Sequence, residues 1–142
     1  MAELNEANTS KILGIDYGES KVGLAMADFE TRMAFAYKTL DNDKNLEQNL
    51  TEIIEKEDIS KIIIGVTSQI NKKQAISPSK KLGTFLTDKL KIEVEYEDEM
   101  FTTKQAHQNL IEKGAKGINR YDDEEAARLI LQSWLDKKSR DA

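Results

Sequence analysis

The stretch KILGIDYGESKVGLAMA, residues 11–27, decides how the fold is interpreted. Residues 11–15 form a short apolar run that ends at Asp16, and a second apolar run begins at Val22 after a turn that contains glycine. This pattern predicts a strand, a tight turn and an antiparallel return strand, with a carboxylate at the end of the first strand. The carboxylate could bind a metal ion or lie near a phosphate there. Asp-x-Gly is also a common turn sequence that has no functional role.

A predicted helix over residues 122–135 begins with four acidic residues. At about 100° per residue its apolar side chains fall on one stripe, which consists of Ala126, Ala127, Ile130, Leu131 and Trp134. Among the four acids only Asp123 projects onto the centre of this stripe. The helix dipole favours acids in a first turn and accounts for Asp122. A carboxylate aimed at a core is costly unless a cation lies there, so Asp123 is a candidate ligand.

A third acidic group follows an alternating segment. Residues 92–97 alternate apolar side chains with Glu93, Glu95 and Glu97, which predicts a half-exposed strand with an acidic face toward solvent. Asp98 and Glu99 come at the strand end, before a helix expected over residues 104–113 that Thr102 or Thr103 can cap. The junction position favours a chemical role for one of these two acids.

Carboxylates at two strand ends and one helix start match the needs of a two-metal phosphodiesterase. Mg²⁺ takes oxygen ligands in octahedral geometry and binds through a few carboxylates, with water and phosphate completing the shell. Two such ions activate the attacking water and stabilise the leaving oxygen. The ions also relieve the mutual repulsion of clustered acids.

The remaining segments complete an α/β pattern. A third strand is expected over residues 33–40, a helix over 45–56, a buried parallel strand over 61–66 and a helix from Pro78 to residue 90. The predicted architecture is a mixed five-stranded sheet, three antiparallel strands and then two parallel ones, with helices on both faces.

Length and composition agree with one domain. The chain has 142 residues and no cysteine, which excludes a disulfide framework, a zinc–thiolate site and a cysteine nucleophile. We expect a disordered tail over residues 1–10 and a single domain over 11–138. No apolar run approaches the ~20 residues of a membrane span and no signal peptide is recognisable, so we expect a soluble cytoplasmic protein.

The net charge of −5 argues mildly against a nucleic-acid ligand, but the distribution of charge can overrule the total. Basic residues gather in the second half of the chain. Lys113, Lys116 and Arg120, with two glycines between them, form a predicted loop that runs into Asp123. This loop is the best candidate for contact with a phosphate backbone; the alternative is a solvated connection between two helices.

Several of these segments together resemble one known family. They are ILGIDYG at 12–18, KVGLA at 21–25, IIIGV at 62–66, DEMFTT at 98–103, and Asp123 with AARLILQS at 126–133. In this order the chain resembles the YqgF family of pre-16S rRNA nucleases, also called Holliday junction resolvase-like proteins, with a ribonuclease H-like fold. The family commonly has Arg where Met100 stands here, and a proline after the glycine of IIIGV that is absent here.

The resemblance implies that Asp16, Glu99 and Asp123 are the catalytic residues and hold Mg²⁺ or Mn²⁺. Gly18, Lys21 and Thr102 lie within the matching motifs and join the basic loop as candidate nucleic-acid contacts. The implied activity is hydrolysis of phosphodiester bonds in structured RNA, in 5′-end processing of pre-16S rRNA during ribosome biogenesis. The alternatives are the same chemistry on branched DNA, or a non-catalytic module that binds ribosomal precursor particles or proteins. Either a monomer or a homodimer fits the sequence.

Overall fold

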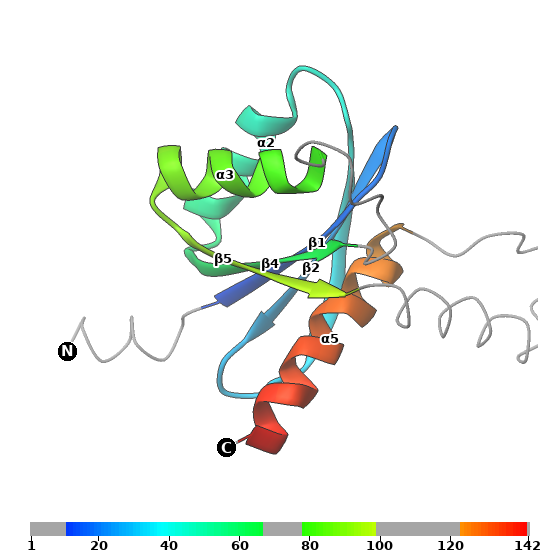
Figure 1. Cartoon of the computed structure of the whole chain (residues 1–142), viewed down its shortest axis with the longest axis vertical. Helices are drawn as coiled ribbons and strands as arrows, with labels where there is room; N and C mark the ends of the chain where they lie inside the picture. Colours follow the sequence, from blue (N-terminus) through cyan, green and yellow to red (C-terminus); the bar gives the residue numbers. More distant parts are fainter. Residues whose placement is uncertain (1–10, 67–77, 99–122, 142) are drawn as a thin grey trace, which may run out of the picture.

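The computed structural model describes residues 11–66, 78–98 and 123–141 (Figure 1). Three sequence-based expectations lie outside these residues: the tail over 1–10, the helix over 104–113 and the basic loop. The described elements, in chain order, are β1 (Lys11–Tyr17), β2 (Lys21–Asp28), β3 (Ala34–Asp41), α2 (Leu46–Lys56), β4 (Ile59–Val66), α3 (Pro78–Leu90), β5 (Glu93–Asp98) and α5 (Asp123–Asp141). Each predicted element within the described residues is present, with ends shifted by a few residues.

The five strands form one sheet in the order β3-β2-β1-β4-β5. The first three strands pair antiparallel, β4 lies parallel to β1, and β5 lies parallel to β4. This is the predicted mixed sheet. Because β1, β4 and β5 run in the same direction, their carboxyl ends meet at one edge.

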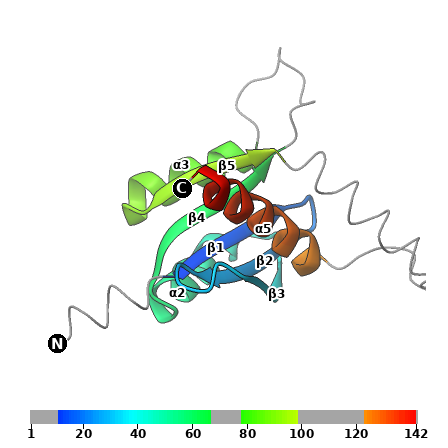
Figure 2. The ribbon, with the colours of Figure 1, turned by 90° about the horizontal axis from the view of Figure 1, so that it is seen from below.

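Helices cover both faces, with α2 and α3 on one side and α5 on the other (Figures 1 and 2). Alternate strand residues fill two separate cores. Leu13, Ile15, Ile62 and Ile64 pack with α2 and α3, whereas Ile12 and Ile63 pack with Ile130 and Leu131 of α5. All eight of these side chains are fully buried. The alternation fixes which strand side chains face α5, and this matters for the site below.

Within the described residues, no helix combines the length and the apolar character that crossing a membrane requires.

Candidate active site

Asp16 lies near the end of β1 and faces α5. Its neighbour Ile15 is buried in the core of α2 and α3, and Gly14 lies against the side chain of Leu131 in α5. Since side chains alternate along a strand, Asp16 shares the face of Gly14. The residue is half-buried at the sheet edge where the parallel strands end.

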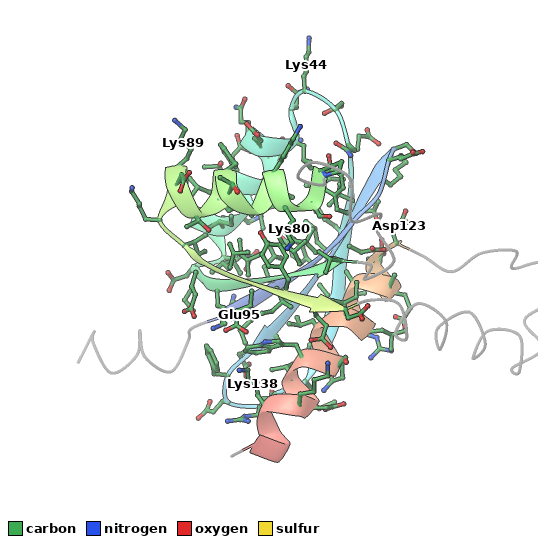
Figure 3. The ribbon with its side chains drawn as sticks, viewed as in Figure 1. Lys44, Lys80, Lys89, Glu95, Asp123 and Lys138 are labelled. Carbon is green, nitrogen blue, oxygen red and sulfur yellow. The ribbon has the colours of Figure 1, made fainter. Side chains whose placement is uncertain are left out.

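Asp123 begins α5 at the same edge (Figure 3). Gly23 of β2 is the register partner of Asp16, and a Cβ built on Gly23 would collide with the carbonyl oxygen of Asp123. One glycine therefore separates the backbone of Asp16 from the backbone of Asp123. The first turn of the helix can approach the sheet this closely only because residue 23 has no side chain.

Hydrogen bonds between α5 and the antiparallel strands hold the helix in this position. Glu124 accepts a hydrogen bond from the hydroxyl of Thr39 in β3. Two turns further along the helix, the side-chain oxygen of Gln132 accepts the backbone N–H of Ala34 at 2.9 Å, and its amide nitrogen donates to the carbonyl of Arg32 at 3.2 Å. The position of Asp123 is thus set by contacts along the length of α5.

The glutamates of β5 correct one expectation. Of the acidic face expected toward solvent, only Glu93 is exposed; Glu95 is half-buried, and Glu97 is buried with 5% of its surface exposed. Both inner glutamates face α5: Trp134 donates to Glu95 at 2.9 Å, and Ser133 and Lys137 each approach Glu97 at 2.8 Å. Sequence alternation identified this face correctly but could not show that a helix covers it.

The same alternation separates Asp98 from Asp16. Tyr96 contacts Gly83 of α3, and Glu97 contacts α5, so the strand turns Asp98 toward the α3 face. Asp16 and Asp123 lie on the α5 side. Glu99, the family-implied ligand, lies outside the described residues.

Lys21 and Gly18 border the two aspartates. Lys21 forms an ion pair with Asp41 at 2.7 Å, and its pKa is raised, first by this hydrogen bond and charge and to a lesser extent by the charge of Asp123. Gly18 serves the β1–β2 turn: its N–H donates to the carbonyl of Lys21 at 2.9 Å, where a Cβ would collide. The structure thus gives Gly18 a turn-forming role and brings Lys21 near enough to Asp123 for that charge to raise the pKa of Lys21 slightly.

The other candidates from the sequence, Glu99, Thr102, Lys113, Lys116 and Arg120, lie outside the described residues. Among residues 11–66, 78–98 and 123–141, no group of three or more histidine, cysteine, aspartate or glutamate side chains forms a metal site. Asp16 and Asp123 are the two candidate ligands that lie within the described residues, and carboxylate oxygens are the donor type that Mg²⁺ and Mn²⁺ prefer. Sequence reasoning missed the role of Gly23; its signal was a glycine directly opposite a strand-end aspartate in a predicted hairpin.

Comparison with known proteins gives a consistent result. Residues 10–137 match the family model described as "RuvX: Holliday junction resolvase". A "Putative pre-16S rRNA nuclease" of Bacteroides fragilis is 33% identical, covering 91% of this chain and 98% of that protein. Proteins of the same description from Streptococcus suis (33% identical, 89% of this chain, 98% of the relative) and Phocaeicola vulgatus (34%, 91% and 97%) also match.

Solved structures agree on the fold. The fowlpox virus resolvase, in complex with Holliday junction DNA, superposes with a TM-score of 0.61 at 15% identity over 90% of this chain and 98% of that chain. RuvC of T. thermophilus, in complex with a Holliday junction substrate, gives a TM-score of 0.53 at 13% identity over 92% and 96%. At these identities the likeness concerns the fold alone, and it confirms the expected ribonuclease H-like architecture.

Proposed function

The chain belongs to the RuvX family, whose model is described as that of a Holliday junction resolvase, and from this membership we propose a metal-dependent endonuclease that hydrolyses phosphodiester bonds in structured RNA. The observation that carries the proposal is the approach of Asp16 and Asp123 to either side of Gly23 at the sheet edge. The names of the relatives support pre-16S rRNA as the substrate, and processing of its 5′ end is the reaction that we propose. Cytoplasmic ribosomal precursor particles are the partners that this role requires.

Asp16, Asp123 and Glu99 are the proposed ligands of Mg²⁺ or Mn²⁺. The assignment of Glu99 depends on the alternation of side chains along a strand. Glu95 and Glu97 face α5, and Glu99 is the next residue in this every-second-residue pattern. This pattern supports Glu99 over Asp98 as the third ligand. When bound, the ions would lower the pKa of the attacking water and neutralise charge that develops on the phosphate.

The protein's own groups have separate tasks in this proposal. Gly23 lets α5 bring Asp123 to the end of β1, and the Glu124–Thr39 hydrogen bond keeps the helix from sliding. Lys21 is exposed at the start of β2, near Asp123, and its ammonium group can bind a phosphate of the substrate. Lys113, Lys116, Arg120 and Thr102 stay proposed contacts on sequence grounds.

The direct test is cleavage of end-labelled pre-16S rRNA with and without Mn²⁺. We expect Mn²⁺-dependent cleavage by the wild type and none by Asp16→Asn or Asp123→Asn, because each loses a ligand oxygen charge. Asp88→Asn is a matched control, since Asp88 is an exposed aspartate on α3. Cleavage that persists in Asp16→Asn would assign the activity to another site or to a contaminant.

A second candidate substrate is branched DNA, which the description of the family model favours. A four-way DNA junction in the same assay separates the two candidates, because the rates of cleavage at equal enzyme concentration show which substrate the site prefers. Absence of cleavage of both substrates by well-folded wild type would overturn the nuclease proposal and leave a non-catalytic binding module.

A further inference from the structure

A pocket of about 380 Å³ opens on the other side of the same sheet edge, between the start of α2 and the start of α3. Its walls come from the end of β1, from the segment that joins β3 to α2, and from the first turns of both helices. Its lining includes Tyr17, Asn42, Asp43, Leu46, Lys81 and Leu82. This volume lies in the lower part of the range for small-ligand pockets, roughly 300–1,000 Å³.

The pocket adjoins the proposed catalytic edge through one peptide bond. Tyr17 follows Asp16 in β1, and successive side chains point to opposite faces, so Asp16 faces α5 while Tyr17 packs on the side of α2 and α3. Consecutive Cα atoms are only about 3.8 Å apart. Asn42, which also lines the pocket, is fixed to the turn after Tyr17, because its side-chain amide donates a hydrogen bond to the carbonyl of Gly18 at 2.7 Å. A nucleic-acid strand that passes over the end of β1 therefore contacts both the proposed catalytic site and the pocket.

The lining suits a flat ring that carries a charged group. Leu46 and Leu82 are buried and supply an apolar floor beside the half-buried ring of Tyr17. Lys81 is exposed at the rim. The carboxylate of Asp43 accepts the backbone N–H of Asn45 at 2.9 Å, which holds this side chain at the start of α2. Lys44 and Glu47 also line the pocket, so its charged residues are two lysines and two acids. Aromatic and apolar surface with nearby cations is the combination on which single-stranded nucleotides bind.

We propose that this pocket holds one nucleotide of the substrate strand next to the scissile phosphate, with its base against Tyr17 and its phosphate at Lys81. The inference rests on the proposed nuclease function and extends it, since it makes an unpaired flanking nucleotide part of what the protein recognises. Fully paired nucleic acid keeps its bases stacked and cannot fill the pocket. The substrate class is therefore a duplex with a single-stranded flank.

The test compares binding of two fluorescein-labelled probes by anisotropy, in Ca²⁺ to avoid turnover. One probe is a stem with a five-nucleotide single-stranded flank and the other is the same stem without the flank, each made in RNA and in DNA. Lys81→Ala is the informative variant because Lys81 is exposed and its loss does not disturb the core. Lys89→Ala is the matched control: it is exposed at the far end of the same helix (Figure 3).

We expect Lys81→Ala to weaken binding of the flanked probe several-fold and to lower the salt slope by about one. Tyr17→Leu, which keeps apolar packing but removes the aromatic face, should weaken it at least fivefold, as loss of about 1–3 kcal/mol of stacking implies. Neither variant should change binding of the blunt stem, and Lys89→Ala should match the wild type on both probes.

Equal binding of the flanked probe by Lys81→Ala and Lys89→Ala would overturn the inference, as would equal losses on both probes or failure of the wild type to prefer the flanked probe. The proposed function fails by a different result, namely wild-type protein that binds but does not cleave in Mn²⁺. The RNA and DNA arms show which nucleotide the pocket accepts.

Discussion

Gly23 and Asp123 meet by backbone alone: a Cβ on Gly23 would overlap the carbonyl oxygen of Asp123 and crowd the N–H of Glu124. The contact sits directly beside Asp16, the register partner of Gly23. Space for a side chain at this point would have to come from lifting the first turn of α5 away from the sheet.

The variant Gly23→Ala should therefore lose cleavage activity out of proportion to its loss of stability. Overpacking of this kind costs about 1–3 kcal/mol, which leaves most molecules folded at 25 °C. The displaced Asp123 should no longer reach a metal ion held by Asp16, as the proposed site requires. The measurement is cleavage rate per folded molecule, with folding checked by urea denaturation.

Gly14→Ala is the control for this experiment. Gly14 lies under the same helix, where a Cβ would come within 2.8 Å of the Leu131 Cβ and 3.2 Å of the Ala127 carbonyl oxygen. We expect a similar destabilisation but a nearly normal rate per folded molecule, because the strain falls in the middle of α5. Equal activity losses in the two variants would mean that general packing, and not the position of Asp123, limits cleavage.

The second prediction concerns metal binding in the folded protein. Mn²⁺ that binds only the native state should raise the melting temperature of the wild type, by an amount equivalent to about 2.7 kcal/mol at a hundredfold excess over the dissociation constant. Asp16→Asn and Asp123→Asn should lose most of this shift, whereas Asp88→Asn should keep it. Thermal melts in EDTA and in Mn²⁺ measure both values, and an undiminished shift in Asp16→Asn would remove that residue from the metal site.

The sequence was sufficient for the sheet but not for the whole site. The turn after Asp16 and the continuous apolar run before Gly65 specify antiparallel pairing and a buried parallel strand, because each pattern has few alternatives. Pro78 likewise marks the first residue of α3, as its missing N–H and fixed φ require. These features are local, so a single sequence contains them.

The sequence did not predict the features that depend on tertiary contacts. Glu97 reads as a solvent-facing residue because alternation gives a face but not what covers that face. The structure places α5 there, with Ser133 and Lys137 on the carboxylate. The closeness of Gly23 and Asp123 is equally non-local, since 100 residues separate them along the chain. The pocket beside Tyr17 arises from three separate segments and has no sequence signature.

The third prediction follows from the unequal burial of Glu97 and Lys137. The side chain of Glu97 is 5% exposed and that of Lys137 is 53% exposed. Lys137→Met should cost more stability than Glu97→Gln, because it leaves a buried carboxylate without its cation, whereas the glutamine variant leaves an exposed ammonium that water solvates. We expect about 1–3 kcal/mol for the lysine variant and less than about 1 kcal/mol for the glutamine variant. Urea denaturation at pH 7 gives both values, and the reverse order would contradict the assignment of the pair as desolvated on the glutamate side.

The last prediction concerns pH and the cluster of Glu95, Lys61 and Trp134. Glu95 lies 2.7 Å from the ammonium of Lys61 and accepts the indole N–H of Trp134 at 2.9 Å. The pKa of Glu95 is lowered from 4.5, chiefly by the hydrogen bond from Lys61, against the opposing effect of burial. Burial alone would lower the pKa of Lys61, but its bonds to Glu93 and Glu95 outweigh that effect and raise it.

A carboxylate whose pKa is lower in the folded protein stabilises that state above the unfolded pKa of 4.5, and the stabilisation is lost as the pH falls through the folded value. Wild type should therefore lose stability below about pH 4.5. Glu95→Gln should be less stable at pH 7, and its difference from wild type should shrink steadily between about pH 5 and pH 3. Glu93→Gln is the matched control, since Glu93 pairs with the same lysine at 2.8 Å but is 64% exposed and should contribute little. Urea midpoints at several pH values provide the comparison. A constant difference between wild type and Glu95→Gln across that range would show that the glutamate stabilises β5 by packing and not by its charge.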